Sequence, residues 1–135
     1  MNTILLFLDI DDVLHPYAPW PIDEAVRARY FCYLPRLESV QRDFPQLQVV
    51  VTSDWRRHHL LDELRAFFSE DRRERIAGTT KLDKPAGDAV GLRQKQVEEY
   101  LEEHGLSECP WIAIDDTVTN YQADSSAAAL HELLR

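Results

Sequence analysis

The sequence TILLFLDIDD, residues 3–12, decides how the rest of the chain is interpreted. Its first six residues are almost entirely apolar, which is typical of a strand buried on both faces in the middle of a parallel sheet. The run is too short to span a membrane, and it has neither the basic flank nor the small-residue cleavage site of a signal peptide. Three acidic residues, Asp9, Asp11 and Asp12, then place carboxylates directly after the strand.

Three other segments carry strand patterns that complete the sheet. Residues 47–51 (LQVVV) and 111–114 (WIAI) are near-continuous apolar runs, and residues 75–79 (RIAGT) are a shorter and weaker candidate. Between these segments apolar residues recur at three- to four-residue steps, which indicates helices. The alternation predicts an α/β fold, a three-layer α/β/α sandwich around a Rossmann-like, mostly parallel sheet. The helical patterns cover residues 26–44, which Pro35 should interrupt or kink, 60–68, 97–101, which His104-Gly105 should stop, and about 124–134.

The size and composition favour one soluble domain. With 135 residues, 44% of them hydrophobic, the chain has material for a single core, and we expect one domain over residues 1–135. The connections at residues 15–46 and 55–92 are too short for a large cap domain. The formal charge is 15 − 24 = −9, which disfavours nonspecific binding to nucleic acid or membrane surfaces. Cys32 and Cys109 allow no disulfide framework, so a reducing, cytoplasmic location is expected.

The polar residues that follow the strands predict a metal-dependent site. In an open α/β sheet the site lies beyond the carboxyl ends of the strands. Carboxylates that gather there repel one another, and since no pair of histidines is near to bind zinc, we expect a hard divalent cation with oxygen ligands, Mg²⁺. The residues in question are Asp9, Asp11 and Asp12 after the first strand, Thr52, Ser53 and Asp54 after the second, and Asp115 and Asp116 after the run WIAI.

Three motifs, in order along the chain, resemble those of a known family. FLDIDDVLHP (residues 7–16), VVVTSDWR (49–56) and WIAIDD (111–116) look like the first, second and fourth motifs of the haloacid dehalogenase-like (HAD) phosphohydrolases. With the helix RQKQVEEYLEEHG (93–105), they are most similar to the small capless HAD domains of Swiss army knife RNA repair-like proteins. The resemblance implies a Mg²⁺-dependent phosphatase. Its substrate would be a phosphorylated small molecule or a phosphorylated macromolecular end.

The resemblance also implies a role for each matched carboxylate. Asp9 would be the nucleophile that attacks phosphorus and forms an aspartyl-phosphate. Asp11 would be the general acid that protonates the leaving oxygen, and then the base that activates water. Mg²⁺ would be held by Asp9, the main-chain carbonyl of Asp11 and Asp115. Asp116 would help Asp115 to hold the metal, or one of this acidic pair would instead only position a water.

The hydroxyl and basic members of the implied site leave alternatives open. Thr52 would donate its hydroxyl to a phosphoryl oxygen, with Ser53 as the rival donor. The family also needs a cation that offsets charge on the nucleophile and the phosphoryl group. The candidates, in order, are Arg93, Lys95 and, in the loop KLDKPAG, Lys84. Arg56 is a candidate for contact with a substrate phosphate, although an arginine bonded to strand-end groups explains the same residue.

Two residues near the nucleophile bear on activity. Asp12 stands where many relatives have glycine, which adds a side chain and a charge next to the proposed metal. His15 lies close to Asp9 in the sequence, but a loop residue is the first interpretation of its position.

Two other classes of protein fit parts of the pattern. A receiver-type phosphoacceptor domain would bind magnesium with Asp11 and Asp12 and accept phosphate on Asp54. Such a domain needs a strand between residues 12 and 47, where the pattern is helical, and it leaves Asp115 and Asp116 without a role. A non-catalytic metal-binding or regulatory module would keep the metal site without turnover. The pattern leaves the oligomeric state open.

Overall fold

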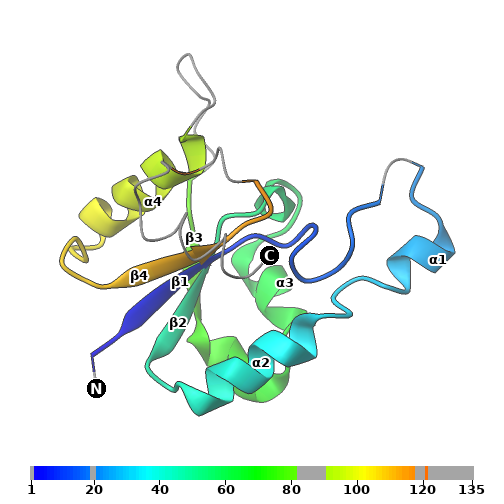
Figure 1. The fold of residues 1–135 in the computed structure, drawn as a ribbon, viewed down its shortest axis with the longest axis horizontal. Helices are drawn as coiled ribbons and strands as arrows, with labels where there is room; N and C mark the ends of the chain where they lie inside the picture. The colour runs from blue at the N-terminus through cyan, green and yellow to red at the C-terminus, as the bar shows by residue number, and fades with distance from the viewer. Residues whose placement is uncertain (1, 19–20, 82–90, 118–120, 122–135) are drawn as a thin grey trace.

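The computed structural model describes residues 2–18, 21–81, 91–117 and 121. Its centre is a four-stranded sheet in the order β3-β2-β1-β4, with every neighbouring pair parallel (Figure 1). All four predicted strand segments are confirmed, and the first and the weakest of them each start one residue later than their patterns. The strands are β1 (Ile4–Leu8), β2 (Leu47–Val51), β3 (Ile76–Thr79) and β4 (Trp111–Ile114).

Helices cover both faces of the sheet, which confirms the predicted three layers. Figure 1 shows α2 (Leu34–Asp43) and α3 (Leu61–Ala66) on one side and α4 (Leu92–Glu103) on the other. Alternate residues of β1 pack against the helices on opposite faces of the sheet, since successive side chains of a strand point to opposite faces. Leu6 and Leu8 belong to the core that includes residues of α2 and α3, whereas Leu5 and Phe7 pack with residues of α4.

The predicted helical stretch at residues 26–44 is divided in the structure. A short helix, α1 (Glu24–Arg27), lies apart from the sheet, and a turn separates it from α2. Pro35 occupies the first turn of α2, where its missing N–H costs no intrahelical hydrogen bond. The predicted interruption therefore falls just before the proline. The helix predicted near residues 124–134 lies outside the described residues.

The register of the strands brings three sequence motifs to one edge. Leu8 of β1 pairs with Val51 of β2 on one side and with Ile114 of β4 on the other. The next residues continue the ladder, because Thr52 N–H donates to the Leu8 carbonyl (2.9 Å) and Asp9 N–H donates to the Ile114 carbonyl (3.0 Å). The segments that follow β1, β2 and β4 thus start side by side.

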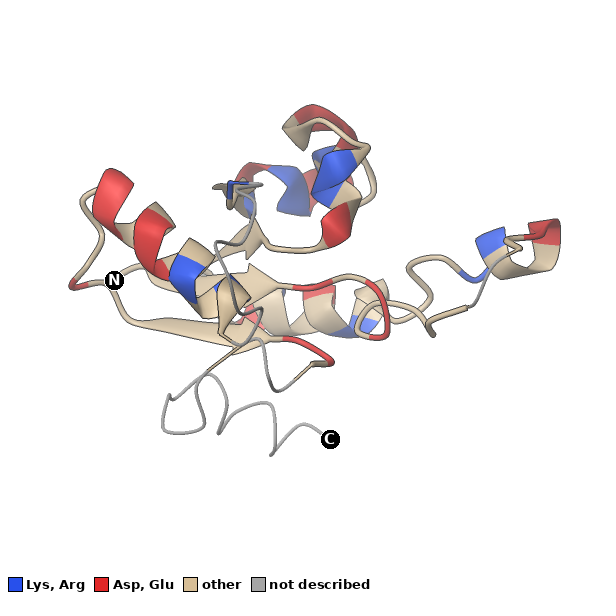
Figure 2. Cartoon of the chain, turned by 90° about the horizontal axis from the view of Figure 1, so that it is seen from above, with Lys and Arg blue, Asp and Glu red and all other residues tan. Residues whose placement is uncertain are grey.

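Charge is distributed unevenly over the described surface. Figure 2 shows acidic residues in the loops at the carboxyl edge and along α4. The Arg/Glu-rich segment between α3 and β3 is a 3₁₀ helix, η2 (Glu70–Arg75), with both signs of charge, and its Asp71 pairs with Arg42 (3.0 Å) and Arg72 (3.2 Å). Within the described part of the chain, every helix lacks the length and apolar character needed to cross a membrane.

Candidate active site

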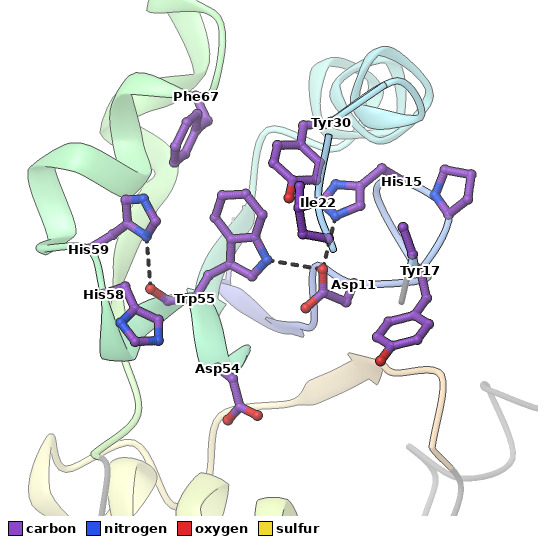
Figure 3. Close-up of a pocket in the computed structure, with 12 residues that line it drawn as sticks. Asp11, His15, Tyr17, Ile22, Tyr30, Asp54, Trp55, His58, His59 and Phe67 are labelled. Carbon is purple, nitrogen blue, oxygen red and sulfur yellow. Dashed lines mark hydrogen bonds and ion pairs between the residues drawn. The ribbon is translucent and has the colours of Figure 1, made fainter. Parts of the chain in front are cut away.

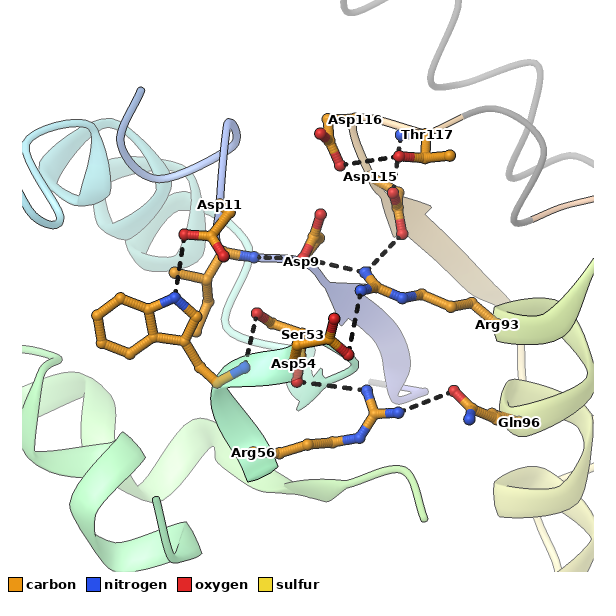
Figure 4. Close-up of polar contacts among 12 residues, drawn as sticks. Asp9, Asp11, Ser53, Asp54, Arg56, Arg93, Gln96, Asp115, Asp116 and Thr117 are labelled. Carbon is orange, nitrogen blue, oxygen red and sulfur yellow. Dashed lines mark hydrogen bonds and ion pairs between the residues drawn. The ribbon is translucent and has the colours of Figure 1, made fainter. Parts of the chain in front are cut away.

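An acidic centre lies at the carboxyl edge of β1 and β4. Asp9 and Asp115 are 3% and 2% exposed, and each directly follows its strand. One carboxylate oxygen each from Asp9, Asp115 and the exposed Asp116 lie within 4.8 Å of one another. Arg93 reaches this centre from α4, and its Nη1 atom is 3.0 Å from Asp9 Oδ1 and 2.9 Å from Asp115 Oδ2 (Figure 4). A single nitrogen therefore bridges two buried carboxylates.

The charges in this centre are strongly coupled. Burial raises the pKa of Asp9 to about 6, although the adjacent Arg93 lowers it, and a hydrogen bond with Asp116 raises it again. Burial lowers the pKa of Arg93, but the carboxylates of Asp9 and Asp115 outweigh that effect and raise it overall. Arg93 therefore remains charged at any physiological pH and is the resident counter-ion of the described cluster.

The donor set fits a hard divalent cation. Three carboxylates supply oxygen ligands only, which suits Mg²⁺ and does not suit metals that prefer sulfur or imidazole. Asp9, Asp115 and Asp116 are the side chains that would hold such an ion. Asp11 was expected to reach the metal through its main-chain carbonyl, and its side chain is not part of this carboxylate cluster.

The structure distinguishes between the cations that the sequence left open. Helix α4 follows Gly91, which has a left-handed φ of +72°. Arg93, in the first turn, points into the acidic centre, whereas Lys95 is on the exposed side of the helix. Lys84 lies outside the described residues. Geometry thus brings Arg93, and not Lys95, to the carboxylates.

Asp11 is held by two donors at the same oxygen. Its Oδ1 accepts hydrogen bonds from His15 Nε2 (2.9 Å) and Trp55 Nε1 (3.1 Å). The hydrogen bond from His15 is the main reason why the pKa of Asp11 lies below its usual value. The Asp11 side chain is 43% exposed, so its carboxylate remains accessible at the edge of the site.

The hydrogen bonds of His15 determine which of its nitrogens carries the proton. Its ring is buried, and Nδ1 accepts a hydrogen bond from Phe31 N–H (3.1 Å). Nε2 must then be the donor to Asp11. Phe31, the donor, has a left-handed φ of +63°, which is unfavourable for a bulky residue. His15 is thus a built-in support of Asp11, which its loop position did not reveal.

The two hydroxyls after β2 have different environments. Ser53 Oγ accepts a hydrogen bond from Trp55 N–H (3.2 Å) and caps the 3₁₀ helix η1 (Asp54–Arg57). Thr52 is fully buried, and among the described residues its Oγ1 makes no hydrogen bond of standard geometry, although the Tyr121 hydroxyl lies close enough to interact with it. A buried hydroxyl without a partner is costly and is expected to find one. Of the two hydroxyls, that of Thr52 is therefore the one that would donate a hydrogen bond to a phosphoryl oxygen.

Arg56 lies behind the site and is not open to solvent. Its Nη2 donates to Gln96 Oε1 of α4 (2.9 Å), and its Nη1 donates to the Ser53 carbonyl (3.4 Å). Burial, followed by the charge of Arg93, lowers the pKa of Arg56 to about 10. The guanidinium ties η1 to α4, so the structure does not bring it to an accessible face where it would contact substrate.

Asp12 does not enter the acidic centre. The side chain is exposed, and its Oδ1 accepts a hydrogen bond from Tyr17 N–H (3.3 Å). Its φ is +59°, in the left-handed region that favours glycine. A glycine at this position would adopt the same backbone conformation without strain.

Tyr121 is a residue of the site that the motifs did not indicate. It is 5% exposed and packs in the α4 layer, with its ring centroid 6.4 Å from that of Trp111. Its hydroxyl is buried and faces that of Thr52, without a hydrogen bond of standard geometry among the described residues. Burial raises the pKa of Tyr121, and the nearby Asp115 carboxylate raises it further. A lone tyrosine after an acidic pair carries no sequence signal, so only the packing identifies it.

The segment between β1 and β2 separates this site from a receiver domain. In its described part the connection holds α1 and α2 and no strand. Asp54, the acceptor in that alternative, is 67% exposed and outside the acidic cluster. The buried carboxylates are instead those of Asp9 and Asp115.

The fold and the site define a haloacid dehalogenase-like domain: an Asp-x-Asp motif after β1, a buried threonine after β2, a cation from a helix and an acidic pair after β4. Within that class, the chain belongs to the family described as the HAD domain in Swiss Army Knife RNA repair proteins, whose sequence profile matches residues 5–133. No significant match was found among curated proteins or among solved structures. Membership of a HAD family indicates a hydrolase of the phosphatase type.

Proposed function

We propose that the protein is a Mg²⁺-dependent phosphohydrolase that acts through an aspartyl-phosphate on Asp9. The observation that carries this proposal is the convergence of two buried carboxylates, Asp9 and Asp115, on the guanidinium of Arg93, beside the buried hydroxyl of Thr52, which makes no hydrogen bond of standard geometry within the described residues. Such a site combines a nucleophile, positive charge and a hydrogen-bond donor within one buried edge. These are the elements that phosphoryl transfer requires.

Asp9 is oriented for nucleophilic attack by its own neighbours. Its Oδ1 accepts hydrogen bonds from Ile10 N–H (2.9 Å) and Arg93 (3.0 Å), which restrict rotation of the carboxylate. In the proposed first step an Asp9 oxygen forms a bond to phosphorus while the bond between phosphorus and the leaving oxygen breaks. Bound Mg²⁺ would supply positive charge to the phosphoryl oxygens and to the nucleophile.

Asp11 is placed to transfer the protons of both steps, and its lowered pKa favours its role as base over its role as acid. It gives a proton to the leaving oxygen as the aspartyl-phosphate forms, and it takes a proton from the water that then attacks phosphorus. The second step breaks the bond between Asp9 and phosphorus, releases inorganic phosphate and restores both carboxyl groups. Arg93 and Thr52 offset the charge of the phosphoryl group throughout.

The substrate remains in the class of phosphorylated molecules. The family description refers to RNA repair proteins, so a phosphorylated RNA end is one member of that class. With a net charge of −9, the chain is not suited to nonspecific binding of nucleic acid, so such an end would be recognised locally.

The direct test is the release of phosphate from an aryl phosphate, with and without Mg²⁺. We expect turnover that requires Mg²⁺ and is abolished by Asp9→Asn. Asp12→Asn is the matched control, since Asp12 has the same charge but is exposed and outside the acidic cluster, and it should retain turnover. Mg²⁺ binding without hydrolysis of any phosphate ester would overturn the proposal and favour a non-catalytic metal-binding module.

A further inference from the structure

A pocket lined by aromatic rings lies directly beside Asp11. This aromatic pocket has a volume of about 570 Å³ and is lined by Asp11 together with Tyr17, Tyr30, Trp55, His59 and Phe67, among others (Figure 3). Its volume falls within the range of small-molecule sites, roughly 300–1,000 Å³. Figure 3 shows Asp11 between Trp55 on one side and Tyr17 on the other. The proposed function uses Asp11 but assigns no role to this pocket.

The position of Asp11 determines which part of a substrate would enter the aromatic pocket. A general acid must lie within hydrogen-bond distance of the oxygen that it protonates. That oxygen belongs to the leaving group, so the rest of the leaving group extends from Asp11. Trp55 lines the pocket and also donates a hydrogen bond to Asp11 Oδ1 (3.1 Å). This hydrogen bond fixes the position of the acid relative to the wall of the pocket.

The wall of the pocket is preorganised by contacts among its rings. The Trp55 ring stacks on His59 (centroids 5.2 Å apart, interplanar angle 18°). Trp55 also contacts Tyr30 edge-to-face (5.1 Å, 81°) and Phe67 edge-to-face (5.6 Å, 87°). A rigid aromatic surface binds a planar ring with little loss of conformational entropy. Tyr17, which is 65% exposed, forms part of the opposite side.

The charge of the lining limits the chemistry of the occupant. None of the twelve lining residues, all in the described part of the chain, is Lys or Arg. Two of them are carboxylates, Asp11 and Asp54, the latter paired with Arg57 (3.4 Å), and three are histidines, so the lining holds no permanent positive charge that would attract a second phosphate. The occupant that fits is an uncharged group with a flat apolar face.

We propose that the aromatic pocket binds the leaving group and selects phosphate monoesters whose leaving alcohol carries an uncharged aromatic ring. This inference rests on the proposed phosphohydrolase function, because it depends on Asp11 facing the leaving oxygen. The ring is either a nucleobase or a phenyl-type ring. Both present the same planar face to the pocket.

The test compares two substrates that differ only in aromaticity. 2-Phenylethyl phosphate and 2-cyclohexylethyl phosphate have leaving alcohols of similar acidity and size, so the chemical step is matched. We expect kcat/KM to favour the phenyl compound by about 10-fold, since several ring contacts contribute. Adenosine 3′-monophosphate and adenosine 5′-monophosphate form a second arm. Faster turnover of a nucleotide than of 2-phenylethyl phosphate identifies a nucleobase as the ring, and the reverse identifies a phenyl-type ring.

A pair of tyrosine variants localises the preference. Tyr17→Leu removes a ring of the pocket without touching the hydrogen bonds of Asp11, and it should reduce the preference for the phenyl compound by about 2- to 5-fold. Tyr33→Leu is the control, because Tyr33 is also exposed but is not among the residues that line the pocket. Turnover of methyl phosphate, which has no ring, should be the same in Tyr33→Leu and in the unaltered protein.

A binding measurement separates failure of this inference from failure of the proposed function. 3-Phenylpropylphosphonate and 3-cyclohexylpropylphosphonate mimic the two substrates but cannot be hydrolysed, and calorimetry gives their Kd values. If no ester is hydrolysed but the phenyl phosphonate binds more tightly in a Tyr17-dependent manner, only the hydrolytic proposal fails. Equal binding of both phosphonates, or equal kcat/KM for both esters, would overturn the assignment of the aromatic pocket.

Discussion

Replacement of Arg93 by methionine tests the electrostatic basis of the site. The Arg93 side chain is 13% exposed, and its Nη1 atom contacts two carboxylates whose side chains are 5% and 2% exposed. Removal of one partner from a buried ion pair typically costs about 3–5 kcal/mol, because the remaining charge is left uncompensated. Asp9 can relieve part of this cost by taking up a proton. We therefore expect Arg93→Met to lower the free energy of unfolding at pH 7.5 by about 3 kcal/mol, at the lower end of that range.

The sign of the pH dependence follows from the pKa of Asp9. In the folded protein this pKa is already raised from 3.8 to about 6, so the folded state binds the proton more tightly than the unfolded chain does. Such a group destabilises the fold as pH rises from about 4 through the folded-state pKa. Loss of Arg93 removes the contact that lowers the pKa of Asp9, so this pKa rises further. The loss of stability that accompanies ionisation of Asp9 then continues to higher pH. The difference between variant and unaltered protein should be smaller at pH 5.5 than at pH 7.5.

Urea denaturation of the metal-free protein, followed by far-UV circular dichroism, measures this effect. Lys95→Met is the control, because Lys95 has the same charge on the same helix but is exposed, and it should change stability by no more than about 0.5 kcal/mol. Added Mg²⁺ should stabilise Arg93→Met more than the unaltered protein, since it would replace the missing counter-ion. The reasoning is wrong if both variants lose the same stability, or if the loss at Arg93 is larger at pH 5.5.

Three further substitutions have distinct expected outcomes. Thr52→Val and Tyr121→Phe each remove a buried hydroxyl that makes no hydrogen bond of standard geometry within the described residues. Thermal denaturation should show unchanged or higher stability, while kcat/KM for an aryl phosphate falls by about 10-fold or more for Thr52→Val. An equal loss of stability and activity in either variant would indicate a structural role instead. Asp12→Gly should relieve the left-handed backbone and raise stability by up to about 1 kcal/mol in urea titrations. A large change in turnover there would contradict the placement of Asp12 outside the acidic centre.

The sequence by itself determined the layers of the fold and the edge at which the chemistry lies. A near-continuous apolar run such as residues 47–51 is typical of a strand in a sheet that is covered on both faces. The carboxyl ends of parallel strands lie at a common edge of the sheet. Asp9, Thr52 and Asp115 could therefore be placed together from their positions after such runs. The interruption near Pro35 was also predictable, because proline restricts the backbone locally.

Only the tertiary structure decided between residues of the same chemical type. Arg93 and Lys95 are two residues apart in one helix, and their different roles follow from which side of α4 faces the sheet. Thr52 and Ser53 are distinguished by the hydrogen bond that Ser53 makes to the backbone of η1.

Tertiary structure was also needed for every contact between distant segments. His15 supports Asp11 because Phe31, from another part of the chain, orients the imidazole. Tyr121 and the rings of the aromatic pocket come from several segments that are far apart in the sequence, so no single motif identifies them together. Local patterns report backbone preference and burial, whereas the direction of a side chain and its partner depend on packing across the whole domain.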